Sequence, residues 1–297
     1  MDNKQGNFQS GLLLAIIGTA LFSIKSIFIK LAYQEGVDTT TLLSLRMLIA
    51  LPFYLLILIW LLRKPETKKP LPKEFLAIFG LGFIGYYLSS YLDLAGLNYI
   101  SAQLERLTLY TYPIMTALLS WLFLREVITK RLMFALVLTY TGVLLLYFHE
   151  SMLTGINASI GVLLVAAAAL SMSFYLVLSK KIITKFGSRL FTSIAMLSST
   201  VFVLIHFLLT NEIENLLINN SAWVYVFMLA IFSTVLPSFM VSEAIARIGA
   251  AKTTIVGTVG PIFTVVLAVF LLGEPFGWIH LAGVLLVIFG VSLLGKK

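Results

Sequence analysis

YPIMTALLSWLFLRE at residues 112–126 returns as GPIFTVVLAVFLLGE at residues 260–274. At the same offset of 148 residues, residues 99–148 align with residues 247–296 without a gap, and thirteen of the fifty aligned positions are identical. The matches beyond the large aliphatic residues are Ala102 with Ala250, Pro113 with Pro261, Thr116 with Thr264, Glu126 with Glu274 and Gly142 with Gly290. The chain therefore contains an internal repeat, and we predict two units, residues 1–150 and residues 151–297.

The composition excludes a water-soluble enzyme. Of the 297 residues, 60% are hydrophobic and only 11% are charged, and the mean hydropathy is +1.01. A soluble domain carries about 25% charged residues, so this chain has too few charges to cover a soluble surface. The sequence contains no cysteine, which excludes disulfide bonds, thiolate chemistry and cysteine-based zinc sites.

Ten apolar runs are long enough to cross a bilayer, because about 20 residues at a rise of about 1.5 Å span the hydrocarbon core. They lie at about residues 10–33, 39–62, 75–98, 101–124, 130–148, 157–180, 190–210, 222–246, 251–272 and 277–295. Each repeat unit holds five runs, and since five is odd, the two units must cross the membrane in opposite senses. The predicted fold is an all-α integral membrane protein with ten transmembrane helices, arranged as two inverted five-helix repeats.

The basic residues predict the orientation. Seventeen of the 21 lysines and arginines fall in segments that share one side when the N-terminus is placed in the cytoplasm. The loops on the other side carry acidic residues instead, which is the pattern of the positive-inside rule. We therefore expect a multi-pass protein of the cytoplasmic membrane with both termini in the cytoplasm. The net charge of +8 then reports topology, and nucleic acid is not an expected partner.

Several short motifs resemble a known family. GLNYISA at residues 96–102, YPIMT at 112–116, LFLRE at 122–126 and TGV at 141–143 resemble the repeat signature of EamA-type members of the drug/metabolite transporter superfamily. RIGAAK at 247–252, GP at 260–261, LLGEP at 271–275 and GV at 290–291 resemble the same signature. The resemblance covers essentially the whole chain. It implies ten helices, alternating access and a central cavity lined mainly by the first four helices of each repeat.

Charged residues inside the predicted helices mark a candidate site. Charge at the bilayer centre costs about 2.5–3.5 kcal/mol on insertion scales, so such residues usually face a cavity or one another. At about 1.5 Å per residue, five of them lie in one slab about 5 Å thick. These five are Lys25, Arg46, Asp93, Glu105 and Arg106, which together sum to +1. The excess positive charge favours an anionic or zwitterionic solute such as an amino acid; the alternative substrate is an organic cation or drug.

Helical spacing adds polar groups to this cluster. Tyr86, Ser90 and Asp93 follow one another at i, i+4 and i+7, which predicts a shared face on the third run. Arg106, Tyr110 and Pro113 have the same spacing on the fourth run. At the repeat offset of 148 residues, their counterparts on the ninth run are Thr254, Thr258 and Pro261. The predicted substrate-binding residues are Lys25, Arg46, Tyr86, Ser90, Asp93, Glu105, Arg106, Tyr110, Thr254 and Thr258. Glu105 and Asp93 are the candidate proton carriers, and a purely structural pair of Asp93 with Arg106 is the competing interpretation.

Other residues have structural interpretations. Pro113 and Pro261 fall in the middle of predicted helices and are expected to act as hinges. Glu126 and Glu274 stand at helix ends, where capping or a contact between the repeats is expected. Lys30, near a helix end, is expected to extend to the outer interface.

Two further features lie outside the central cluster. Glu243 is expected either to pair with Arg247 four residues on or to gate the inner side. GLGFIG at residues 80–85 fits G-x-G-x-x-G, but it lies inside a membrane run and predicts a small-residue packing face rather than a nucleotide site.

The predicted function is secondary transport of a small organic metabolite, either proton-coupled or facilitative. The alternative is a membrane-embedded enzyme or lipid-modifying protein that uses buried carboxylates. We expect a small-molecule substrate and membrane lipids as partners, a monomer or homodimer, no cofactor and no metal site. The sequence does not specify the substrate, the direction of transport, the coupling ion or the resting conformation.

Overall fold

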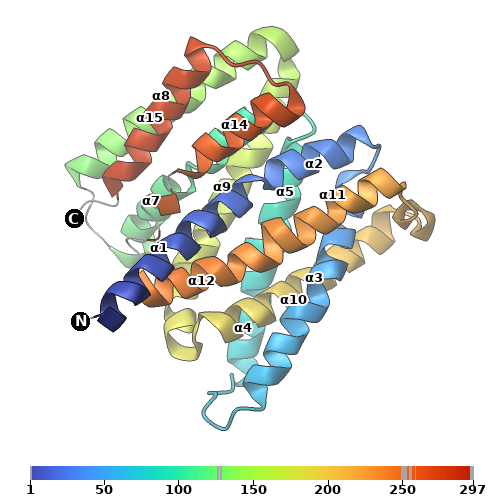
Figure 1. Cartoon of the computed structure of the whole chain (residues 1–297), viewed down its shortest axis with the longest axis vertical. Coiled ribbons are helices and arrows are strands. Elements are labelled where there is room, and N and C mark those ends of the chain that lie inside the picture. Colours follow the sequence, from blue (N-terminus) through green and yellow to red (C-terminus); the bar gives the residue numbers. More distant parts are fainter. Residues whose placement is uncertain are drawn as a thin grey trace.

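The computed structural model describes residues 2–125, 127, 129–248, 253, 256–257 and 259–294. Every regular element in this described part is helical (Figure 1). In the first half these are α1 (Asp2–Ser23), α2 (Lys25–Gln34), α3 (Thr39–Leu62), α4 (Pro72–Gly82), the π-helix η1 (Phe83–Leu88), α5 (Ser89–Gly96), α6 (Ala102–Leu109), α7 (Tyr112–Leu124) and α8 (Lys130–Thr154).

The second half follows a similar order. Its elements are α9 (Ile156–Phe186), α10 (Ser188–Thr210), the short 3-10 helix η2 (Ile213–Leu216), α11 (Asn220–Ala230), the π-helix η3 (Ile231–Val235), α12 (Leu236–Ile248), α14 (Gly260–Leu272) and α15 (Trp278–Leu294).

Seven helical segments in the described residues are long and apolar enough to cross a membrane. They are Phe8–Gln34, Thr39–Leu62, Pro72–Gly96, Lys130–Thr154, Ile156–Phe186, Ser188–Thr210 and Asn220–Val241. Two apolar helices, Gly260–Leu272 and Trp278–Leu293, are shorter. The chain is thus an all-helical, multi-pass membrane protein, whereas the count of ten spans and their inverted arrangement stay predictions.

Helices from distant parts of the sequence lie side by side. α1 packs along α12, α3 along α10, α5 along α9 and α8 along α15, as Figure 1 shows for the blue and orange pair and for the green and red pair. Glycines allow the α8–α15 backbones to approach closely. A Cβ atom on Gly142 would lie 2.6 Å from the Gly283 carbonyl oxygen, and one on Gly290 would lie 3.0 Å from the Ala135 carbonyl oxygen. Such small residues are the usual means of tight helix packing in membranes.

The G-x-G-x-x-G segment packs helices, as the sequence predicts. A Cβ atom on Gly82 would lie 2.9 Å from Ser198 Cβ of α10, and one on Gly85 would lie 2.8 Å from Tyr175 Cβ of α9. Gly80 has no such neighbour within 4 Å. Two of the three glycines are therefore required by close helix contacts.

Two π-helical segments interrupt long helices at matching places. η1 begins at Phe83 and η3 begins at Ile231, which is the repeat offset of 148 residues. A π segment shifts the hydrogen-bond ladder and frees carbonyl groups, and it is frequent at functional sites. Hydroxyl groups bind the carbonyls here: Ser171 Oγ donates to Ile84 O at 2.7 Å, and Thr234 Oγ1 donates to Leu229 O at 2.9 Å.

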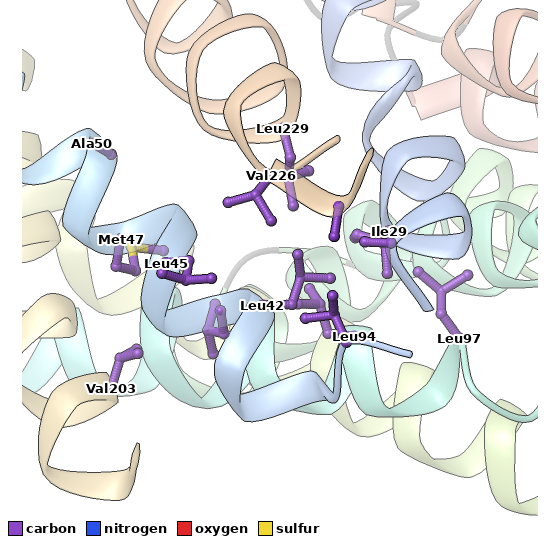
Figure 2. Close-up of a cluster of buried hydrophobic side chains, with 14 of the residues drawn as sticks. Ile29, Leu42, Leu45, Met47, Ala50, Leu94, Leu97, Val203, Val226 and Leu229 are labelled. Atoms are coloured by element: carbon purple, nitrogen blue, oxygen red, sulfur yellow. The ribbon is translucent and has the colours of Figure 1, made fainter. Parts of the chain in front are cut away.

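One hydrophobic cluster fixes the helices that carry the charged residues. Figure 2 shows side chains of α2, α3, α5, α10 and α11 meeting in it, among them Ile29, Leu42, Leu94, Val203 and Val226. All five are fully buried. Because Ile29 and Leu94 lie on α2 and α5, this cluster sets the separation of the two helices that bear Lys25 and Asp93.

Candidate functional site

A break in the first helix forms one wall of the candidate site. α1 ends at Ser23 and α2 begins at Lys25, so that the Ile27 amide donates to Ile24 O at 3.1 Å and not to Ser23 O. The Ser23 carbonyl instead accepts a hydrogen bond of 2.9 Å from Thr264 Oγ1 of α14. The break therefore joins the first helix to the second half of the chain and places Lys25 and Ser26 at the start of a new helix.

The fourth run is also broken, and this corrects the hinge prediction. α6 ends at Leu109 and α7 begins at Tyr112, so Pro113 lies in the first turn of a helix and not in its middle. Pro261 has the same position in α14. Because proline has no amide hydrogen, the carbonyl four residues before Pro261 lacks its helical donor. That carbonyl, Gly257 O, accepts a hydrogen bond of 2.6 Å from the Tyr110 hydroxyl.

Four of the five clustered charges meet where α2, α5 and α6 converge. Lys25 Nζ forms an ion pair with Asp93 Oδ2, and Ser26 Oγ donates to Glu105 Oε2 at 2.5 Å. Lys25, Asp93 and Arg106 all lie within electrostatic range of Glu105. Asp93 and Glu105 are 2% and 0% exposed, so both carboxylates are enclosed by protein.

Arg106 has different partners from those predicted. Its Nη2 donates to Ser23 Oγ at 3.3 Å, and its guanidinium lies 5.1 Å from the centre of the Tyr110 ring. The proposed structural pair of Asp93 with Arg106 is wrong, because Asp93 pairs with Lys25.

Arg46 is a buried cation held by a hydroxyl group. Its side chain on α3 is buried, and its Nε donates to Thr234 Oγ1 of η3 at 2.9 Å. Asp93 lies within electrostatic range, but in the described part of the chain no carboxylate forms an ion pair with Arg46. Arg46 Nη1 is buried without a hydrogen-bond partner. Thr234 was not predicted from the sequence, since its role depends on the π segment.

Several charged atoms of the cluster lack partners. Besides the Arg46 donor, three further charged atoms are buried without a hydrogen-bond partner: Arg106 Nε, Asp93 Oδ1 and Glu105 Oε1. Most buried polar groups in native proteins are hydrogen-bonded, so each exception needs an explanation. Two cationic donors and two anionic acceptors in one cluster are complementary to a molecule that carries both a carboxylate and an ammonium group.

The remaining predicted site residues are not all in the cluster. The Tyr86 hydroxyl lies 3.2 Å from that of Tyr175 on α9, whereas Asp93 pairs with Lys25 of α2, so the two ends of the predicted face have different partners. η1 changes the helical spacing between Tyr86 and Asp93, which explains the difference. Ser90 is half-buried on α5. Thr254 and Thr258 lie outside the described residues.

At one end of the molecule, two carboxylates bind the N-terminus of α6. Glu274 accepts from the amides of Ala102 and Gln103, which is the contact between the two halves that the sequence predicts. Glu150, which was not predicted, accepts from Ser101. Lys30 lies within electrostatic range of both carboxylates and is partly exposed, and its extension to the interface stays a prediction. Glu126, the repeat counterpart of Glu274, lies outside the described residues.

The opposite end carries an ionic group joining three helices. Glu243 accepts from Arg247 Nε at 3.0 Å, as one of the two interpretations of Glu243 expects. It also accepts from Arg189 Nη2 of α10 at 2.7 Å, and Arg247 Nη1 donates to Ser10 Oγ of α1 at 2.9 Å. All three charged side chains are partly exposed, so each pair contributes at most about 1 kcal/mol.

Comparison with known proteins matches this architecture. The model of the EamA-like transporter family matches residues 9–148 and again residues 159–296. The chain is 29% identical to the uncharacterized transporter YcbK of Bacillus subtilis, over 97% of this chain and 96% of that protein. It is 23% identical to an uncharacterized transporter of Archaeoglobus fulgidus, over 98% and 99% of the two chains.

A solved structure shares the fold. A crystal structure with 16% sequence identity superposes with a TM-score of 0.68 and covers 96% of this chain and 97% of that chain. At this identity the likeness concerns the fold alone.

Proposed function

This chain belongs to the EamA-like transporter family, and from that premise we propose that it moves a small anionic or zwitterionic organic solute, such as an amino acid, across the cytoplasmic membrane by alternating access. The relatives that it matches carry the name transporter, which is consistent with a protein that is not an enzyme. The class of solute, the residues that bind it and the alternating-access cycle are the proposed parts of this function.

One observation carries the choice of solute. Arg46 Nη1 and Arg106 Nε are buried cationic donors without a partner, and Asp93 Oδ1 and Glu105 Oε1 are buried acceptors to which no described group donates. In the proposed complex, the solute carboxylate binds Arg46 and an ammonium group binds the side of the cluster that holds the two carboxylates. A lipophilic cation would leave Arg46 unpaired, and burial of an unpaired charge is costly.

The pairing of the helices supports a two-fold relation between the repeats, and the odd number of predicted spans in each repeat makes that relation an inverted one. At the repeat offset, α1 corresponds to α9, and α5 corresponds to the α12 region. The contact of α1 with α12 is therefore the counterpart of the contact of α5 with α9. α3 packs on its counterpart α10, and α8 packs on its counterpart α15. A two-fold relation between halves produces this pattern, and transporters built this way rock two halves around a site near the midplane.

Glu105 is the proposed proton carrier, with Asp93 as its neighbour. Two buried carboxylates within electrostatic range of each other repel when both are ionised, so one proton shared between them is favoured. Ser26 and Lys25 each bind one of the two groups, and the Asp93 and Glu105 side chains are within hydrogen-bond reach of each other, so one proton can be shared between them. Facilitative transport without a proton is the competing mechanism.

The proposed hinges are the helix starts at Pro113 and Pro261. Each proline follows a break in a run that sequence analysis treats as one helix. The Tyr110 hydroxyl at one break donates to the Gly257 carbonyl at the other, so bending at one break displaces the backbone at the other.

Transport by purified protein in liposomes tests the proposal. We expect uptake of a radiolabelled amino acid or carboxylate, driven by a pH gradient, and loss of that pH dependence in Glu105→Gln. Glu243→Gln is the matched control, because Glu243 is a partly exposed carboxylate of the ionic group at the far end. Preference for quaternary cations with carboxylates ignored would overturn the solute class, and loss of pH dependence only in Glu243→Gln would overturn the choice of carrier.

A further inference from the structure

Building on the proposed transport function, we infer that Glu274 is a positioning residue that holds the N-terminus of α6 closed over the buried charges. Its release from α6 opens the site toward the end of the molecule where Glu274 lies. Neither the family match nor the charge cluster assigns this role to Glu274.

Glu274 and Pro275 of the second half form hydrogen bonds with Ala102 and Gln103 of the first half, and we call this contact the clasp. Glu274 lies in the connection between α14 and α15, and its carboxylate accepts from Ala102 N at 2.7 Å and from Gln103 N at 3.2 Å. The Gln103 side chain reaches back and donates from Nε2 to Pro275 O at 3.0 Å. Three hydrogen bonds therefore tie the first turn of α6 to one short connection of the second half.

A second carboxylate binds the same helix start from the first half. Glu150 of α8 accepts from Ser101 N at 2.6 Å and from Ser101 Oγ at 2.7 Å. The partial positive charge of a helix N-terminus favours both carboxylates. Because Glu150 and α6 belong to the same half, a relative movement of the two halves leaves this contact intact. The same movement separates Glu274 from α6, so Glu274 is the one of these two carboxylates that is released.

The short helix α6 connects the clasp to the buried charges, because it carries both. α6 has eight residues, and only Leu104 separates the residues that Glu274 binds from Glu105 and Arg106. These two side chains contact Ser26 and Ser23 at the break between α1 and α2. Displacement of the α6 N-terminus therefore moves both charges against the first helix. With the clasp closed, Asp93 and Glu105 are enclosed, which is consistent with a closed path at this end.

Cysteine accessibility tests the inference, since the natural chain has no cysteine. A single reporter, Ser90→Cys, lies on α5 near Asp93 and is half-buried. A membrane-impermeant maleimide is applied to right-side-out vesicles and separately to inverted vesicles. We expect Glu274→Ala to raise the labelling rate of the reporter at least tenfold in one vesicle orientation only. Glu274→Gln, which keeps one acceptor oxygen, is expected to give a smaller rise in the same orientation.

Two controls separate this role from general loosening. Glu212→Ala removes an exposed carboxylate of the connection before η2, and it is expected to leave labelling unchanged. A second reporter, Ala195→Cys, lies fully buried in the core around α10 and is expected to stay unreactive in Glu274→Ala. Unchanged labelling at residue 90, or an equal rise at residue 195, would overturn the inference.

The design remains decisive if Glu274→Ala fails to fold. Gln103→Leu then removes only the bond to Pro275, and the same one-sided rise is expected at a smaller amplitude. Because labelling requires no solute, it is independent of the proposed substrate. Failure to transport amino acids with one-sided labelling intact would refute the substrate class and leave the clasp standing.

Discussion

Arg46 illustrates how one buried side chain distinguishes binding from stability. Its guanidinium is enclosed and is held by a neutral hydroxyl group, so the empty protein bears the cost of burying an unpaired cation. In the proposed function, the carboxylate of the solute supplies the missing negative charge.

We therefore expect Arg46→Gln to weaken binding of a carboxylate solute by at least about thirtyfold, equivalent to about 2 kcal/mol. Thermal stability of the empty protein is expected to stay equal or to rise, because the buried charge is removed. Solute titration by calorimetry and thermal unfolding in detergent measure the two effects. Arg63→Gln, at the exposed end of α3, is the control. A parallel fall in stability and affinity would instead make Arg46 a structural residue.

Arg125 provides a test of backbone strain. It is the non-glycine residue with a positive φ among those described, at 57°, and its repeat counterpart Gly273 has a φ of 68°. Both end a helix in the left-handed conformation, which costs a side-chain-bearing residue about 1–2 kcal/mol.

Arg125→Gly is expected to stabilise the protein by a net of about 0.5–1 kcal/mol, after the greater flexibility of unfolded glycine is subtracted. Gly273→Ala is expected to destabilise it by a similar amount. Unfolding midpoints in the same detergent measure both changes, and a lower midpoint for Arg125→Gly would contradict the strain argument.

The helices themselves were largely predictable, but their interruptions were not. Apolar runs locate the long helices, because hydrophobic length is what a bilayer selects. The breaks at Ser23 and at Tyr110 depend on acceptors and donors supplied from elsewhere: Thr264 binds the carbonyl of the first break, and Gly257 binds the hydroxyl of the second. Such partners lie more than a hundred residues away, so local spacing treats each broken run as a continuous helix.

The sequence predicted the residues of the candidate site better than the contacts that they make. Charge depth alone groups Lys25, Asp93 and Glu105, and the structure brings these three together. The partner of Asp93 was wrong, and the contact of Arg46 with Thr234 was missed. Both depend on helix rotation, which a break or a π segment changes by an amount that the sequence pattern does not encode.

The α8–α15 pair gives a test of helix packing. A Cβ atom on Gly142 would lie 2.6 Å from the Gly283 carbonyl oxygen, which is backbone and cannot rotate away. Gly142→Leu is therefore expected to destabilise the protein by about 1–3 kcal/mol or more. Gly80→Leu is the matched control, because no atom lies within 4 Å of the added Cβ, and it is expected to be near neutral. Equal unfolding midpoints for the two variants would contradict this account of the interface.

Considered as one molecule, the chain combines a symmetric scaffold with an asymmetric site. Matching π segments and reciprocal helix contacts follow the repeat, and the family match covers both halves. The buried charges lie in the first half, whereas Thr234, Thr264 and Glu274 approach them or their helices from the second. Composition and repeat could predict the scaffold, but the cross-half contacts required coordinates.

The five charges of the central cluster also have an electrical consequence. With both carboxylates ionised, Lys25, Arg46 and Arg106 outweigh Asp93 and Glu105 by one positive charge. A membrane voltage of about 100 mV does about 2.3 kcal/mol of work on each elementary charge carried across it. In the proposed cycle, a monoanionic cargo makes the occupied carrier electroneutral, and the voltage then drives only the unoccupied carrier. A zwitterionic solute leaves the net charge of the cluster unchanged, and the membrane voltage then acts on both the occupied and the unoccupied carrier.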